Sequence, residues 1–217
     1  MPDPPSELYH FSEDPNIQVF EPHIAPTSAL KDPLVWAVDS EHADLYYFPR
    51  NCPRVSFVAS PDTSAEDIER YLADTDARRV SAIEASWLPA MRNTNVYRYV
   101  FPGDDFQLMD QNAGYWASHQ TVRPVRVEPV GDLMQALAGA GIELRVMPSL
   151  WPLYQAVIAS SLGFSIIRWR NPAPRPRRSP ENQENVSTYN PELACREPRQ
   201  RVEGRAPGSE RRLTPHA

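Results

Sequence analysis

The sequence Leu8-Tyr9-His10-Phe11-Ser12 decides how the chain begins to fold. Aromatic residues dominate this run, which predicts a β-strand that starts near Glu7. Residues 1–6 are rich in proline, which a sheet interior does not accept, so we predict a disordered lead-in there. Because side chains alternate along a strand, His10 and Ser12 are expected to point to the same face of the sheet.

Further strands and helices are predicted between residues 34 and 169, and consecutive strands often lack a helix between them. Apolar runs predict strands over 34–38, 55–59, 80–86, 96–101, 122–130, 142–146 and 164–169. Cap residues predict helices that follow Ser40, Ser64, Asp132 and Ser149. About eight strands and four helices in this order indicate a single mixed α+β domain over residues 7–170 rather than a doubly wound parallel sheet.

The charge of the chain is distributed unevenly. Residues 171–217 contain 8 prolines, 9 arginines and 6 glutamates but few apolar side chains, so we predict a disordered tail with a net charge of +3. The remaining residues 1–170 carry a net charge of −9. An acidic domain without a basic stripe argues against nucleic acid as its partner.

Several classes of protein are excluded by what the sequence lacks. No apolar run approaches the length of a membrane span, so we expect a soluble, cytoplasmic protein. The two cysteines, Cys52 and Cys195, lie in no CxxC or Cys/His pattern, and the histidines lie in no zinc-binding pattern, so no metal site is predicted. Six glycines in residues 1–170 form neither GxGxxG nor GxxxxGK[ST], which excludes the common phosphate-binding loops.

Three groups of residues could carry chemistry. On the first strand, His10 and Ser12 could together bind a ribose or a carboxamide, although a half-buried structural histidine is an equal alternative. Ser40 and His42 lie close to acidic residues in the sequence, as the members of a hydrolase triad could. However, Ser40 fits a helix cap, and no nucleophile elbow is present. In the run Gly114-Tyr115-Trp116, the aromatic rings could stack on a base or pack in the core.

The first group resembles the Tyr-His-x-Ser/Thr opening of the ADP-ribosyltransferase-like superfamily. The run Leu34-Val35-Trp36-Ala37-Val38-Asp39, followed by Ala43 and a tyrosine at 46 or 47, is similar to the second segment of that superfamily. More closely, residues 7–170 resemble a bacterial family of unknown function whose members begin with the motif LYHFSE. The pieces that carry this closer resemblance are 8–13, 33–39, 48–50, 114–116 and 164–168.

The superfamily resemblance implies an ADP-ribosyltransferase-like α+β fold and a pocket for NAD or a related nucleotide, with NAD as a substrate rather than a bound cofactor. It implies that the nucleoside is held by His10 and Ser12. We expect a stacking surface from Tyr46, Tyr47, Tyr115 or Trp116. We expect a phosphate contact from Arg50 through its guanidinium.

One departure from the superfamily pattern puts catalysis in doubt. Active transferases place a glutamate beside the ribose, whereas the segment from Gly114 to Ser118 contains none. Asp110, Glu128 or Glu143 could supply the missing carboxylate, and the sequence does not select among them. Two hypotheses therefore stay open, an ADP-ribosyltransferase-like enzyme and a non-catalytic binding domain. No protein partner is predicted.

Overall fold

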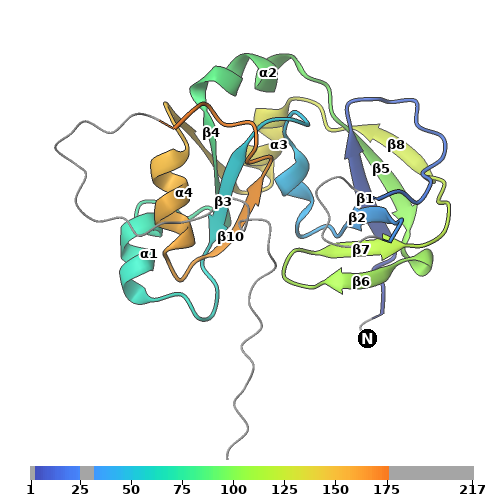
Figure 1. Cartoon of the computed structure of the whole chain (residues 1–217), viewed down its shortest axis with the longest axis horizontal. Coiled ribbons are helices and arrows are strands. Elements are labelled where there is room, and N and C mark those ends of the chain that lie inside the picture. Colours follow the sequence, from blue (N-terminus) through green and yellow to red (C-terminus); the bar gives the residue numbers. More distant parts are fainter. Residues whose placement is uncertain (1–2, 25–31, 176–217) are drawn as a thin grey trace, which may run out of the picture. The chain divides into compact units, whose positions relative to one another are not determined.

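The computed structural model describes residues 3–24 and 32–175. In these ranges the chain forms two β-sheets with helices against them (Figure 1). The strands are β1 (Glu7–Ser12), β2 (Val35–Val38), β3 (Arg54–Val58), β4 (Arg79–Glu84), β5 (Tyr97–Pro102), β6 (Gln107–Asp110), β7 (Tyr115–Ser118), β8 (Arg126–Pro129), β9 (Ile142–Met147) and β10 (Gly163–Ile167). The α-helices are α1 (Ala65–Leu72), α2 (Leu88–Asn93), α3 (Leu133–Gly139) and α4 (Trp151–Ile158), and the 3-10 helices are η1 (Ala43–Tyr46), η2 (Ala85–Trp87) and η3 (Gly103–Asp105). The predicted mixed α+β class is confirmed.

The first sheet has six strands in the order β6-β7-β2-β1-β5-β8, and all its neighbours are antiparallel. One face carries an apolar core built on Leu8, Ala37, Tyr99 and Phe101. Phe20, from the segment that follows β1, packs against this core. Strand β1 therefore lies in the middle of the sheet, as its aromatic sequence requires.

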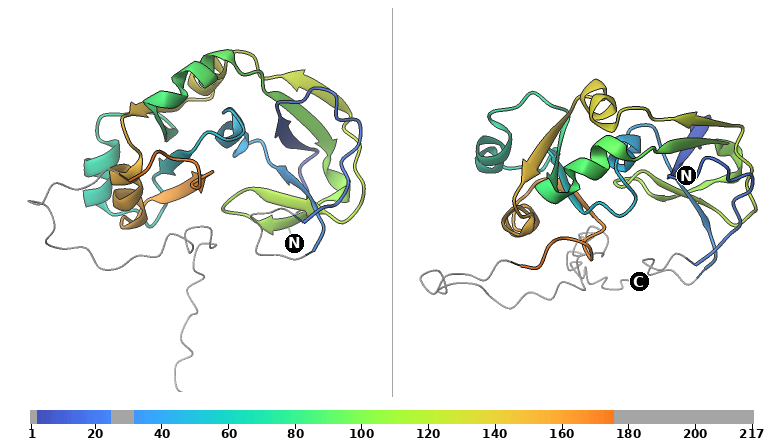
Figure 2. Two further views of the ribbon diagram at one scale, coloured as in Figure 1. Left: turned by 45° about the horizontal axis from the view of Figure 1, so that its top comes forward. Right: turned by 90° about the horizontal axis from the view of Figure 1, so that it is seen from above.

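The second sheet has four strands in the order β10-β3-β4-β9. Its β4 and β9 are parallel, while its other neighbours are antiparallel. Figures 1 and 2 show α1 and α4 beside this sheet, and α3 packs on β9. A second apolar core joins the two sheets, because Phe11 of β1 packs with Phe48, Ile83 and the helices α2 and α3.

A buried ion-pair group attaches η1 to the second sheet. The carboxylate of Asp44 is 2% exposed and accepts from Arg79 Nη1 at 2.6 Å and from Arg78 Nη2 at 2.7 Å. Both carboxylate oxygens are thus occupied by guanidinium groups at the start of β4. This contact, together with the hydrogen bond from Arg54 Nε to the Leu45 carbonyl, holds η1 against the second sheet.

Several local predictions are confirmed by the helix caps. The Asp132 carboxylate accepts hydrogen bonds from the N–H groups of Met134 and Gln135, and the Ser64 hydroxyl accepts from Asp67. Gly141 has a φ of +72° where α3 ends. Each cap satisfies backbone groups that a helix end leaves without partners.

Other elements differ from their predictions. The predicted helix over 41–47 is a single 3-10 turn, η1, and the predicted strand over 122–130 is shortened to β8 by Pro124. Strands β6 and β7 and helix α2 were not predicted, since four to six residues give too little pattern.

Two hydrogen bonds join the fold to residues just outside the predicted domain of residues 7–170. The Ser6 carbonyl accepts from the Gly103 N–H at 3.3 Å, and the Ala173 N–H donates to the buried Glu84 carboxylate at 2.8 Å. The described residues belong to one compact unit. Residues 1–2 of the predicted lead-in and residues 176–217 of the predicted tail lie outside the described residues.

We expect the substitution Asp44→Asn to lower the free energy of unfolding by about 3 kcal/mol, because it leaves the buried Arg79 guanidinium without a counter-charge. Urea unfolding of the two proteins measures this difference. Asp74→Asn, at an exposed position, is the matched control and should change stability by less than about 0.5 kcal/mol. A loss below about 1 kcal/mol for Asp44→Asn would show that η1 is held mainly by other contacts.

Candidate functional site

The first sheet is split between β1 and β2. In the described structure these strands pair at one position, Tyr9 with Val38, whereas β1 pairs with β5 at six. Beyond Tyr9 a side chain replaces the strand pairing, since the Nδ1 of His10 lies 3.0 Å from the Trp36 carbonyl oxygen. The pairing between β1 and β2 therefore stops after one position in the middle of the sheet, and we call this interruption the notch.

His10 is held in one tautomer at this notch. A carbonyl oxygen only accepts, so the bond to Trp36 requires the proton on Nδ1 and leaves a lone pair on Nε2. Burial lowers the pKa of His10 below its usual value, and the neighbouring Arg50 charge lowers it further. The ring is therefore neutral at pH 7, and its Nε2 is an acceptor. Phe20 lies against the ring at 4.9 Å between centroids.

The predicted site residues lie on two faces of the sheet. His10 and Ser12 share one face, as their spacing predicts, and Ser12 is buried there and accepts from the Asp14 N–H. Trp116 lies in the apolar core of the same face. Tyr115 points to the opposite face, because it pairs with Val38. The structure thus does not gather all the predicted ligand contacts on one surface.

On the Tyr115 face a group of aromatic side chains surrounds the split. The Tyr46 hydroxyl donates to the Tyr115 hydroxyl at 3.1 Å, which leaves the Tyr115 hydroxyl hydrogen available to another acceptor. Phe11 stacks on Tyr46 with a centroid distance of 5.8 Å, and Trp36 meets Tyr115 edge to face at 6.1 Å. Burial, and then the Tyr115 hydroxyl, raise the pKa of Tyr46 well above its usual value, so Tyr46 stays a donor.

A buried arginine without a carboxylate lies beneath this group. Arg54 is 3% exposed, and its guanidinium donates to the carbonyls of Leu45 and Cys52 and lies 5.8 Å from the Tyr46 ring centroid. Burial lowers its pKa to about 10, so the guanidinium is still charged at neutral pH. Its Nη2 has no hydrogen-bond partner in the described part of the chain. A buried charge without a counter-ion is costly, and an anion would relieve that cost.

Three further arginines lie near Arg54 or near its neighbour Arg168. Arg168 Nε donates to the Arg50 carbonyl at 2.8 Å, and Arg168 has a φ of +57°, a conformation uncommon for a residue with a side chain. Burial, and then the charges of Arg50 and Arg170, lower the pKa of Arg168. Within residues 3–24 and 32–175 none of these four arginines forms an ion pair with a carboxylate. We call Arg50, Arg54, Arg168 and Arg170 the arginine group.

Two of the three proposed carboxylates are engaged elsewhere. Glu128 accepts from Arg98 and Arg126, and these bonds lower its pKa. Glu143 accepts from Arg145, whose bond lowers the pKa of Glu143, and it lies on β9 of the second sheet.

Asp110 is different, because it pairs across β6 and β7 with Tyr115 and so shares the face of that tyrosine. Its Oδ1 accepts from the N–H groups of Asn112 and Ala113 at 2.8 and 3.2 Å. Of the three candidates, the structure brings only Asp110 next to a predicted ligand residue.

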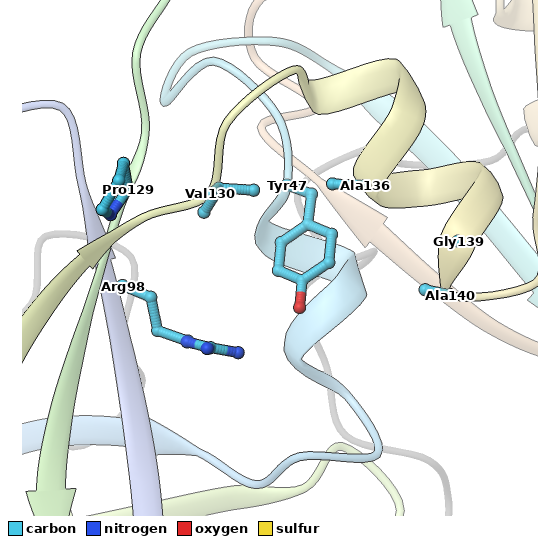
Figure 3. A pocket seen from close by; sticks show the side chains of 7 residues that line it. All are labelled: Tyr47, Arg98, Pro129, Val130, Ala136, Gly139 and Ala140. Atoms are coloured by element: carbon cyan, nitrogen blue, oxygen red, sulfur yellow. The ribbon is translucent and has the colours of Figure 1, made fainter.

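Tyr47 lines a separate cavity of about 330 Å³ (Figure 3). Arg98 and Val130 line it from the first sheet and the segment after it, and small residues of α3 form the opposite wall. The Arg98 charge is already balanced by Glu128. This cavity therefore lacks the unbalanced charge of the arginine group, and we separate Tyr47 from the site at the split.

A histidine and a carboxylate form a pair at the end of β2. His42 Nδ1 lies 2.8 Å from Asp39 Oδ1, and the His42 N–H donates to the same oxygen at 3.0 Å. Gly114 covers the pair with a φ of +64°, and a Cβ at this position would lie 2.2 Å from His42 Nδ1. Only glycine leaves room for this pair.

The structure therefore connects residues that the sequence keeps far apart. Tyr46, Tyr115 and Arg50 were predicted as ligand contacts, and Tyr46 and Tyr115 do contact each other. Arg54, Arg168 and Arg170 were missed because nothing in a sequence shows which arginines lack an acidic neighbour in space. The one available indication was Arg54, a charged residue directly before a predicted buried strand.

The fold and this site define an α+β protein in which the first sheet is split between β1 and β2 and the arginine group lies at the start of β3, before it and after β10. A family model described as "Family of unknown function (DUF6886)" matches residues 9–172, and the chain belongs to this family. The expected membership of a family of unknown function is thereby confirmed. The comparisons with curated proteins and with solved structures found no match. The resemblance to the ADP-ribosyltransferase-like superfamily stays a prediction.

The described residues show neither a membrane-spanning helix nor a metal-binding cluster. None of their helices has the length and apolar character needed to cross a lipid bilayer. They also contain no group of three or more His, Cys, Asp or Glu side chains placed to hold a metal ion.

We expect Gly114→Ala to destabilise the protein by more than Gly131→Ala does. Both glycines have a positive φ, so both variants incur backbone strain of about 1–2 kcal/mol. At Gly131 an added Cβ meets nothing within 4 Å, whereas at Gly114 it collides with His42 and Asp39. Thermal unfolding of both variants measures the difference. Equal losses of stability in the two variants would show that the His42–Asp39 pair can move away from the added Cβ without destabilising the protein.

Proposed function

We propose that the notch binds a nucleotide of the NAD class, with the diphosphate on the arginine group and one ring near the aromatic side chains. The observation that carries this proposal is the buried, charged and carboxylate-free Arg54. Five arginines of the described residues are balanced by acids in salt bridges, as Arg126 is by Glu7 and Glu128. An arginine group left unbalanced on an acidic domain favours an anionic ligand.

Phosphate is the anion that fits such a group best. Guanidinium groups present several N–H donors in a plane and bind phosphate oxygens through paired hydrogen bonds. The free hydrogen of the Tyr115 hydroxyl adds a neutral donor beside them. A diphosphate would use both kinds of donor, whereas a single carboxylate would leave most of the arginine donors unused.

The surroundings of the arginine group suit the rest of a nucleotide. Trp36 and Tyr115 supply aromatic surface for a planar ring. The neutral His10 offers its Nε2 as an acceptor for a ribose hydroxyl or a carboxamide N–H through the split between β1 and β2. His10 is close enough to the arginine group for the Arg50 charge to lower its pKa. Ser12, whose hydroxyl already accepts from Asp14, contributes to the position of the strand end.

ADP-ribosyl transfer from NAD is a second candidate, favoured by the position of Asp110 opposite Tyr115. The reaction needs a carboxylate beside the ribose to stabilise the positive charge that develops there. Asp110→Asn retains the oxygen that caps the following turn and removes the charge. Nicotinamide release that falls by about 100-fold in this variant would establish cleavage at the ribose carbon, the step that transfer requires. No release from a protein that binds NAD would leave the non-catalytic function.

We expect NAD and ADP-ribose to bind the native protein with heats measurable by isothermal titration calorimetry. Arg50→Gln should weaken binding by about 10- to 100-fold, because it removes a charge-assisted contact of about 1.5–3 kcal/mol. The Arg50 side chain makes no hydrogen bond to the described residues, so the fold should not suffer. Arg92→Gln, at an exposed position of α2, is the matched control and should bind normally.

Tyr115→Phe tests the neutral donor separately, since it removes only the hydroxyl. Binding that is absent at millimolar ligand in the native protein, or unchanged in both Arg50→Gln and Tyr115→Phe, would contradict the proposed site.

A further inference from the structure

The His42–Asp39 pair has the geometry of a proton acceptor. Asp39 Oδ1 lies 2.8 Å from His42 Nδ1, and a carboxylate in this position holds the proton on Nδ1 and directs the lone pair to Nε2. Nε2 has no hydrogen-bond partner in the part of the chain that the structure describes, and the His42 side chain is 13% exposed. The ring therefore presents an unused, accessible base.

The pair is attached to the two segments that form the notch. His42 immediately precedes η1, which ends with Tyr46. Gly114, which touches the ring of His42, directly precedes Tyr115. The hydrogen bond between Tyr46 and Tyr115 joins the same two segments. The base and the anion-binding donors are thus carried by one pair of short segments, and Asp44 fixes one of them.

The positive charge of the arginine group favours one of the two reactions that a general base could assist on a bound nucleotide. Cleavage at the ribose carbon develops positive charge, which an arginine group opposes. Attack on phosphorus keeps or increases negative charge on the phosphate oxygens, which arginines stabilise. The four arginines of this group, none of which has a carboxylate partner among the described residues, therefore favour phosphorus as the electrophile.

We propose that His42 is the general base for hydrolysis of the phosphoanhydride bond in the nucleotide held by the arginine group. Water gives a proton to Nε2 of His42, and its oxygen forms a bond to phosphorus. The bridging P–O bond breaks, and its electron pair stays on the oxygen of the departing phosphate. Asp39 is a positioning residue that holds the ring. This inference rests on the proposed nucleotide binding and adds a reaction to it.

The test uses the full chain with NAD and ADP-ribose as probes and separates the products by chromatography. Hydrolysis of the phosphoanhydride yields AMP from both probes, with nicotinamide mononucleotide or ribose 5-phosphate as the second product. ADP-ribosyl transfer or glycosidic cleavage instead releases nicotinamide from NAD. The products therefore distinguish this inference from the second candidate function.

We expect His42→Gln to lower the kcat for AMP formation by about 100-fold or more, which is the usual contribution of a general base. The Kd for ADP-ribose should stay within about twofold of the native value. His119→Gln, at an exposed position, is the matched control and should retain full activity. No AMP from a native protein that binds ADP-ribose, or equal rates in His42→Gln, would overturn the inference and leave nucleotide binding intact.

A measurement on the native chain covers the case in which His42→Gln does not fold. Nitrogen-15 NMR of the histidine rings should find the proton of neutral His42 on Nδ1, and Asp39→Asn should weaken that preference while lowering kcat more than it changes KM. A native His42 with its proton on Nε2 would leave no lone pair for water and would overturn the inference.

Discussion

Both oxygens of the buried Asp44 carboxylate bind arginines at the start of β4, and the rest of the site depends on this contact. Asp44 belongs to η1, a single turn with too few hydrogen bonds to be stable alone. Once η1 is fixed, the Leu45 carbonyl can orient the Arg54 guanidinium and Tyr46 can reach Tyr115. One ion-pair group thus sets the geometry of the donors on the Tyr115 face.

Two sets of arginines in the described residues lie in different electrostatic environments. In the first, acids neutralise them at the surface or in the interior, as in the pairs that Asp44, Glu7, Glu128 and Glu143 form. In the second, the arginine group has carbonyls, aromatic rings and one another as neighbours. The first environment supports the fold, and the second provides the cationic donors of the proposed nucleotide site. Residues 1–170 carry a net charge of −9, so a group of arginines without acidic partners is unexpected in this domain.

The sequence predicted the class of fold and the caps well, because both depend on neighbours along the chain. Asp132 caps α3 through residues two and three positions away, and His10 and Ser12 share a face because of strand alternation. Which face they occupy could not be predicted, since it depends on the pairing of β1 with β2 and β5. The separation of His10 from Tyr115 has the same origin, and so has the capture of Glu128 by Arg98. Such contacts join residues 30 to 100 positions apart, and no local pattern records them.

The central claim is that the arginine group binds anions, and an NMR titration of arginine Nε–Hε signals with inorganic pyrophosphate tests it most directly. The account predicts saturable shifts for Arg54 and Arg168, while Arg145, which is paired with Glu143, does not respond. Shifts of similar size for all arginines, or saturable shifts only outside the arginine group, would contradict it.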